Sequence, residues 1–329
     1  MAAASGEGAI ALLGDTMLGR SVADALKRVP PAEVWAPEVR EIALGCDAVV
    51  CNLECCVSSR GRRTDRVSGK PFFFRAPEAA IESLRAIGVS AVGLANNHAL
   101  DYGTDALLDT LELVSAGGIE LCGAGRDLEE ARRGAVFEAG ARRVGLVGVS
   151  DHPDEFAAAD GSPGIAHAEL DRGIPEWLAD ELARLRGECD QVIAFPHWGP
   201  NMTPAPAPWQ RDAAEQMQAA GADLVAGHSA HVFHGVAWPE AGPVLFDLGD
   251  ALDDYAVDGV LRNDLGVMAL WRSGKAELEL VGLALDYCHT RLADGEEVEW
   301  IAARLERACG ELGTRVERTG TQYFAVRPR

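Results

Sequence analysis

The feature that most constrains this chain is a regular alternation of short apolar runs with amphipathic stretches. The apolar runs are brief, rich in Val, Leu, Ile and Ala, and followed by polar residues, which is typical of buried β-strands. The amphipathic stretches carry apolar residues at helical spacing. Because alternating strands and helices form layered sheets covered by helices, an α/β domain is predicted. Buried strands are expected over 9–14, 48–51, 90–95, 144–149, 192–195, 223–226 and 243–246.

Local signals mark the ends of two of the helices. Pro77 opens one helical segment and Gly88 closes it. Thr104 caps a second segment, which ends at the glycine pair 117–118. Two more helical patterns and a late antiparallel pair of strands complete the predicted elements: 209–220, 298–312, 265–271 and 278–285.

The charge balance restricts the partners of this chain. Lys and Arg number 30 against 51 Asp and Glu, which gives a formal net charge of −21. Such a chain repels phosphate backbones and anionic bilayers, so we expect neither nucleic acid nor membrane as a partner. Eight scattered cysteines without a CxxC pair indicate reduced thiols. The N-terminus lacks a basic, signal-like segment, and a cytoplasmic location is therefore expected.

Polar side chains of metal-ligand type follow five of the predicted strands. Taken alone, each is more typical of a turn, a helix cap or a structural histidine. Five separate strand ends that all carry such residues are hard to explain as independent turns. The carboxyl ends of strands in an open α/β sheet are also where functional sites form. Carboxylate, amide and imidazole groups suit Zn, Mn or Fe. The residues are Asp15, Asn52, Glu54, Asn97, His98, His197, His228 and His231.

These strand-end motifs, taken in order, resemble those of the CapA-like proteins. That family is named for poly-γ-glutamate capsule synthesis and is similar to the calcineurin-like metallophosphoesterases. The resemblance implies a four-layer α/β/β/α sandwich with two mixed sheets, and it covers about residues 8–290. The matching segments are GDTMLGR (14–20), NLE (52–54), FRAPEAAI (74–81), NNHALDYG (96–103), HWG (197–199), GHSAHV (227–232) and GPVLFDLGDALDDY (242–255).

The resemblance implies a centre of one or two divalent ions. Glu54 would bridge the ions, with Asp15 and His231 on one of them. The ligands of the other ion would be Asn97, His197 and His228. Met17 stands where the superfamily has a histidine, so the first ion would have one ligand fewer.

The resemblance also implies residues that act on the substrate. His98 would be the general acid, and Asp101 would orient it. Asn52 and Arg20 would border the site, although either could equally be a turn residue.

A basic segment between residues 60 and 75 is a candidate for binding anionic groups. Lys70 and Arg75 are its expected contacts, and a solvated loop with incidental charge is an equally good interpretation. Asp151 and His152 follow another predicted strand, where they would line the pocket or cap a helix.

The resemblance implies a single domain over residues 1–329, with its core at about 8–290 and a helix-and-strand extension over 291–329. The leading hypothesis is a phosphoesterase-like, metal-dependent hydrolase acting on an anionic small molecule or polymer. One alternative is amide-bond hydrolysis or acyl transfer on a glutamate-like substrate, because the same centre could activate a carbonyl. Another is a non-catalytic accessory role in polymer synthesis. The oligomeric state stays open.

Overall fold

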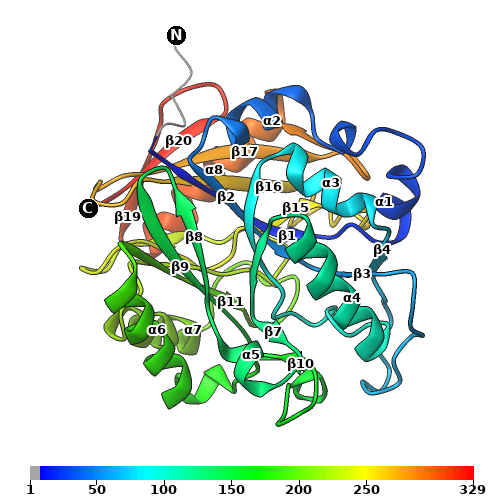
Figure 1. Cartoon of the computed structure of the whole chain (residues 1–329). Helices are drawn as coiled ribbons and strands as arrows, with labels where there is room; N and C mark the ends of the chain where they lie inside the picture. Colours follow the sequence, from blue (N-terminus) through cyan, green and yellow to red (C-terminus); the bar gives the residue numbers. More distant parts are fainter. Residues whose placement is uncertain (1–7) are drawn as a thin grey trace.

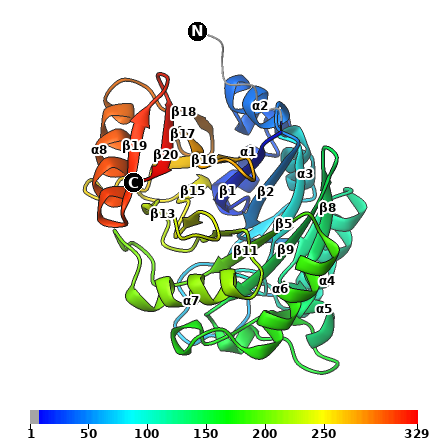
Figure 2. The same ribbon diagram turned by 90° about the vertical axis from the view of Figure 1, so that its left-hand side faces the viewer.

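The computed structural model describes residues 8–329 and shows a mixed α/β fold with two large sheets (Figures 1 and 2). The first sheet has ten strands. Eight form its main path, in the order β19 (Thr314–Arg318), β20 (Tyr323–Pro328), β17 (Leu278–Leu285), β16 (Leu265–Trp271), β1 (Ile10–Thr16), β2 (Ala48–Leu53), β5 (Val89–Gly93) and β6 (Glu120–Cys122). Two more flank it: β15 (Asp250–Leu252) pairs with β1, and β18 (Thr290–Leu292) pairs with β17.

The second sheet has six strands. Their order is β13 (Val236–Ala237), β14 (Val244–Leu245), β12 (Leu224–Ala226), β11 (Gln191–His197), β9 (Arg142–Ser150) and β8 (Ala135–Ala139). Two short pairs lie outside both sheets: β3 (Cys56–Val57) with β4 (Arg75–Ala76), and β7 (Ala124–Gly125) with β10 (Gly164–Ile165).

The helices connect these strands. They are α1 (Arg20–Ala25), α2 (Pro37–Leu44), α3 (Ala79–Ala86), α4 (Gly103–Ala116), α5 (Leu128–Arg132), α6 (Glu176–Glu188), α7 (Pro208–Ala219) and α8 (Gly295–Glu311), with short 3₁₀ turns at Pro31–Val34, Asp154–Phe156 and Leu170–Arg172. Within residues 8–329, no helix combines the length and the apolar character that crossing a bilayer requires.

Strand alternation explains how the sheets pack. On β1, Ala11 and Leu13 face a core shared with α2, α3 and α4, whereas Ile10 and Leu12 face a core shared with the second sheet. On β11, Phe195 faces that same inter-sheet core, and its neighbours face α6 and α7. Successive side chains of a strand point to opposite faces, so each central strand contributes to two cores.

The predicted α/β class with mixed sheets is confirmed. In the first sheet, β1, β2, β5 and β6 run parallel, whereas β16, β17, β20 and β19 pair in antiparallel fashion. In the second sheet the central strands are parallel and both edge strands are antiparallel. Helix α8 packs into the inter-sheet core through Val298, Ile301 and Leu305, and β20 joins β17. Because α8 enters this core rather than covering an outer face, the four-layer description stays a prediction, as do the domain limits.

Candidate metal centre

The carboxyl ends of parallel strands from both sheets meet, and they bring together residues that are far apart in the sequence. Asp15 lies at the end of β1, and Glu54 follows β2 directly. His197 ends β11, while His228 and His231 lie in the loop after β12. A bridge holds His197 beside His228 within the second sheet. The Ser229 amide donates to Asp15 Oδ2 (3.0 Å) and so links the second sheet to the first.

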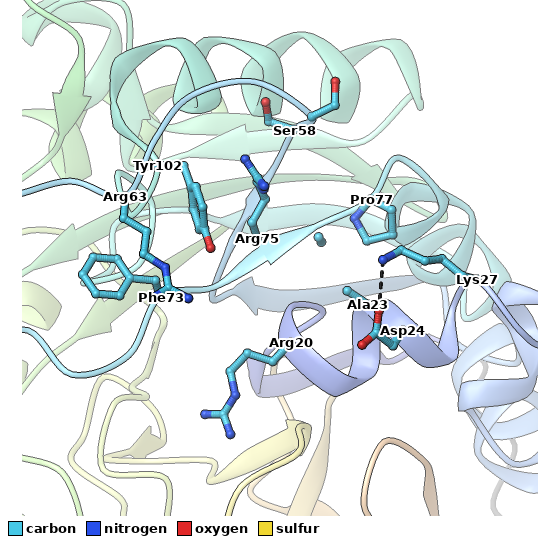
Figure 3. Close-up of a pocket in the computed structure, with 12 residues that line it drawn as sticks. Arg20, Ala23, Asp24, Lys27, Ser58, Arg63, Phe73, Arg75, Pro77 and Tyr102 are labelled. Atoms are coloured by element: carbon cyan, nitrogen blue, oxygen red, sulfur yellow. Dashed lines mark hydrogen bonds and ion pairs between the residues drawn. The ribbon is translucent and has the colours of Figure 1, made fainter.

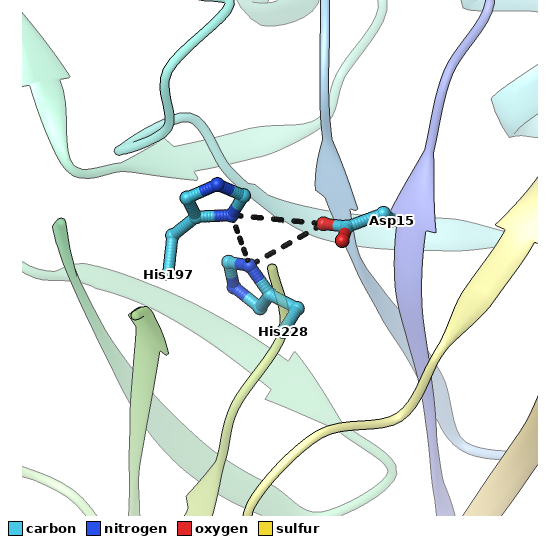
Figure 4. A group of neighbouring side chains, drawn as sticks. All are labelled: Asp15, His197 and His228. Carbon is cyan, nitrogen blue, oxygen red and sulfur yellow. Dashed lines mark hydrogen bonds and ion pairs between the residues drawn. The ribbon is translucent and has the colours of Figure 1, made fainter. Parts of the chain in front are cut away.

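The first group consists of Asp15, His197 and His228, all buried (Figure 4). The Nδ1 atoms of the two histidines lie 2.8 Å apart. They lie 3.7 Å (His197) and 3.5 Å (His228) from Asp15 Oδ1. Two imidazole nitrogens and one carboxylate oxygen therefore converge on a single point.

The second group consists of Asp15, Glu54 and His231, which are also buried. His231 Nδ1 lies 3.3 Å from Asp15 Oδ2, and His231 Nε2 lies 3.9 Å from Glu54 Oε1. In each group the ligand atoms lie within 4.8 Å of one another. The carboxylate shared by the two groups is Asp15, whereas the resemblance placed this bridging role on Glu54.

Several buried polar atoms at this place have no hydrogen-bond partner within residues 8–329. They are Glu54 Oε1 and Asn97 Oδ1, together with the Nε2 atoms of His197 and His228, the ring nitrogens opposite the Nδ1 atoms that face Asp15. Buried polar atoms in folded proteins nearly always have a partner, so such a cluster requires an explanation. Carboxylate, amide and imidazole donors together match the ligand preferences of Zn, Mn and Fe. The residues present therefore fit a divalent ion.

Met17, at the position of the missing histidine, is fully buried in the core beside α1. Its sulfur accepts a hydrogen bond from the Gly19 amide (3.0 Å), so the side chain has a structural role.

Neighbouring side chains hold the acidic groups in place. The Asn52 amide donates to Asp15 Oδ1 (2.6 Å), and the Asn96 amide donates to Asn52 (3.1 Å). The Tyr255 hydroxyl donates to Glu54 Oε2 (3.0 Å). Asn52 is thus placed to orient a ligand from within the core. Asn96 and Tyr255 lie inside motifs named above, but sequence reasoning gave them no role.

Asp250, a third carboxylate at the centre, was missed by sequence reasoning. Its Oδ1 lies 2.8 Å from His231 Nδ1, and its Oδ2 has no hydrogen-bond partner within the described part of the chain. Strand β15 pairs with β1 so that Asp250 lies opposite Asp15. With Asp250 on Nδ1, the nitrogen of His231 left for an ion is Nε2, which faces Glu54. A carboxylate on the other nitrogen of a ligand histidine fixes the orientation of the ring.

We expect Asp250→Asn to weaken divalent-metal binding about 10- to 100-fold, because His231 loses the carboxylate that orients it. Competition of Mn²⁺ or Zn²⁺ against a chelating dye measures this affinity. The matched control is Asp264→Asn, whose carboxylate instead pairs with Arg262 (2.7 Å). Equal metal affinity in Asp250→Asn and in the parent chain would remove this role of Asp250.

The charges of the buried groups depend on one another. Burial raises the pKa of Glu54 to about 8, and the charge of Asp15 adds to this shift. Burial lowers the pKa of His228 to about 4. Although burial acts to raise it, the pKa of Asp15 is held below its usual value by His231 and the other histidines. Burial opposes protonation of His231, yet Asp250 and Glu54 raise its pKa. The carboxylates of Asp15, Glu54 and Asp250 thus favour a positive charge between them, on His231 or on a bound cation.

His98 and Asp101 form a dyad beside the centre. His98 Nδ1 lies 2.5 Å from Asp101 Oδ2, and its Nε2 lies 3.9 Å from Glu54 Oε1. The His98 ring stacks on Phe74 at 3.8 Å, and the Phe74 amide donates to Asp101 Oδ2 (2.6 Å). These contacts fix the ring with one nitrogen directed toward the centre.

Lys70 contacts this dyad through an almost fully buried side chain (8% exposed). Its ammonium lies 3.3 Å from Asp101 Oδ1. It also donates to the Asn97 carbonyl (2.7 Å). Together with the Thr64 amide, which donates to the Asp101 carbonyl (2.9 Å), it anchors the basic segment to the site. The structure thus places Lys70 against the dyad, and its role toward the substrate stays a prediction.

The remaining predicted substrate contacts lie in separate hollows around the centre. Arg20 pairs with Asp254 (3.2 Å) and lines a hollow of about 460 Å³ that also contains His98 and His231. Arg75 lies in a neighbouring hollow. Asp151 and His152 form a pair on another side, where the His152 ring lies 5.2 Å from that of His197.

A mixed α/β fold with buried carboxylates and imidazoles at the meeting point of two sheets is the arrangement of a metallophosphoesterase-like protein. The chain belongs to the bacterial capsule synthesis protein family PGA_cap, whose model matches residues 9–255. The recognition of CapA-like motifs is thereby confirmed.

Curated relatives support the same assignment. The chain is 30% identical to a probable polyglutamine synthesis accessory protein of Mycobacterium tuberculosis, over 82% of this chain and 74% of that protein. It is 26% identical to the capsule biosynthesis protein CapA of Bacillus anthracis, over 83% of this chain and 66% of that protein. It is 25% identical to the PGA biosynthesis protein CapA of Bacillus subtilis, over 82% and 69% respectively.

Proposed function

We propose that this chain is a metal-dependent hydrolase of the phosphoesterase type that acts on an anionic small molecule or polymer. The observation that carries the proposal is the position of Asp15, whose two carboxylate oxygens face two separate groups of buried ligands. The proposal includes a four-layer α/β/β/α sandwich and a cytoplasmic location. The free thiols of all eight cysteines support that location.

The ligand set divides between the two groups. Asp15, Glu54 and His231 would hold one ion. Asp15, His197 and His228 would hold the other, with Asn97 as a further ligand through its unpaired oxygen. An ion bound there would supply Lewis-acid chemistry by polarising an oxygen of the substrate.

The chain's own residues would bind the substrate and transfer a proton. The hollow that contains His98 and His231 is also lined by Arg20, Phe74 and Tyr255, so a substrate there meets both the ligands and a cation. His98 presents Nε2 on the side of the centre, where it would protonate the leaving group. Asp101 holds the opposite nitrogen and fixes the ring in that orientation.

A second candidate is amide-bond hydrolysis or acyl transfer on a glutamate-like substrate. The names of the relatives, which refer to polyglutamine and PGA synthesis, favour it. A non-catalytic accessory role, named for the mycobacterial relative, is the third candidate.

We expect the purified chain to hydrolyse bis-(p-nitrophenyl) phosphate in the presence of Mn²⁺, Zn²⁺ or Fe²⁺. Removal of the metal with a chelator should reduce turnover to background, and returning the metal should restore it. The absorbance of the released p-nitrophenolate gives the rate. No turnover with any divalent metal would remove the phosphoesterase proposal. Release of glutamate from γ-glutamyl peptides under the same conditions would favour the second candidate.

A further inference from the structure

A second hollow, of about 450 Å³, lies beside the one that contains His98. Arg20, the first residue of α1, lines both hollows. The rest of the second hollow comes from α1, the segment after β3, the strand β4 and Tyr102, which directly precedes α4 (Figure 3). Its basic residues include Arg63 and Arg75. A molecule bound in the first hollow therefore has a neighbouring space to occupy on the far side of Arg20.

The basic residues of the second hollow differ in how their charges are balanced. Lys27 pairs with Asp24 (3.0 Å), and Arg20 pairs with Asp254 (3.2 Å). Within the part of the chain that the structure describes, neither Arg63 nor Arg75 forms an ion pair. Both arginines line the same hollow, so two guanidinium groups without a carboxylate partner lie together there. Their positive charge is available to an anionic ligand.

The guanidinium group of each arginine lies over an aromatic ring. The Arg75 guanidinium lies 4.1 Å from the centre of the Tyr102 ring, and that of Arg63 lies 5.2 Å from the Phe73 ring. One Arg75 nitrogen donates to the Arg60 carbonyl (3.2 Å). Stacking covers the face of a guanidinium and leaves its edge donors free, and this planar fork matches carboxylate or phosphate oxygens.

We propose that the hollow around Arg63 and Arg75 binds a second oxyanion of the substrate. This inference rests on the proposed function and narrows it to substrates that carry at least two phosphate or carboxylate groups along one chain. One group lies at the metal ligands and His98, and the next lies across Arg20 against the two stacked arginines. A substrate with a single small anion uses the first hollow alone.

Calorimetric titration of the full chain with two probes, inorganic tripolyphosphate and γ-linked pentaglutamate, tests this inference. Excess Mn²⁺ is present throughout, so that neither probe removes metal from the protein. We expect at least one probe to bind, and the tighter probe identifies the oxyanion. Arg63→Gln and Arg75→Gln should each weaken binding about tenfold, because each removes a charged donor pair. Arg75→Lys should also weaken it, since an ammonium lacks the planar fork.

The matched control is Arg62→Gln, which removes the same charge from an exposed neighbour that does not line this hollow. Its affinity for the probe should change by less than about twofold. No binding of either probe, or equal affinity in the parent, Arg63→Gln and Arg75→Gln chains, would overturn the inference. If Arg75→Gln does not fold, the affinity of Arg63→Gln for the probe tests the inference by itself.

The outcomes separate this inference from the proposed function. Probe binding that depends on Arg63, in a chain that does not hydrolyse the phosphodiester, would support the oxyanion subsite and remove the phosphoesterase proposal. If the chain hydrolyses bis-(p-nitrophenyl) phosphate but substitution of Arg63 or Arg75 leaves probe binding unchanged, only the oxyanion-subsite inference is removed.

Discussion

Exchange of His98 for Gln is expected to lower kcat for phosphodiester hydrolysis by about 10²- to 10⁴-fold, the usual contribution of a positioned acid or base. His98 Nε2 faces the centre, while its other ring nitrogen lies against Asp101. The glutamine side chain has no group that could protonate a leaving oxygen. Because His98 itself belongs to neither ligand group, the bound metal should stay near the parent level. Steady-state kinetics together with elemental analysis measure both quantities.

The matched control for this variant is His289→Gln, in a short connection between β17 and β18 that lies outside both ligand groups. It should hydrolyse the substrate like the parent chain. If His98→Gln retains full kcat, the general-acid role is wrong. A substrate with a better leaving group should show a smaller loss, since it needs less protonation. An equal loss for good and poor leaving groups would indicate that His98 acts on something other than the leaving oxygen.

Exchange of Asp15 for Asn should have the largest effect on bound metal, because Asp15 belongs to both groups of candidate ligands. We expect the bound metal to fall below the parent value at both positions. The chain would lose several kcal/mol of transition-state stabilisation, or about 10³-fold or more in kcat/KM. An amide has no net charge and would also disturb the hydrogen bonds that Asp15 accepts from Asn52 and the Ser229 amide.

Asp160→Asn is the matched control, because it makes the same chemical change at an exposed position. Circular dichroism of the two variants shows whether any loss comes from unfolding. A folded Asp15→Asn chain with parent-like metal content and turnover would show that the two groups of side chains do not act as one centre.

That these side chains lie close together could be predicted because each follows a strand. The carboxyl ends of parallel strands meet at one edge, and therefore the motifs around Asp15, Glu54, His197 and His228 converge although they are far apart in sequence. The predicted alternation of strands and helices is likewise reproduced in the central strands of both sheets.

Other parts of the site depend on tertiary pairing that the sequence pattern does not contain. Asp250 reaches His231 only because the short strand β15 pairs with β1, a contact between residues far apart in the chain. The charge of its segment predicts a substrate contact for Lys70, but it does not predict that the loop folds back and places the Lys70 ammonium 3.3 Å from Asp101. The sharing of Asp15 between two groups depends on the angle of one carboxylate, which no motif specifies.

The central claim is that Asp15, Glu54, His197, His228 and His231 together hold divalent metal. The most direct test is elemental analysis of the parent chain, purified without added metal, and again after incubation with Mn²⁺ or Zn²⁺ and dialysis. We predict at least one tightly retained transition-metal ion per chain, and a second after loading. A folded chain that retains no transition metal under either condition would contradict the claim.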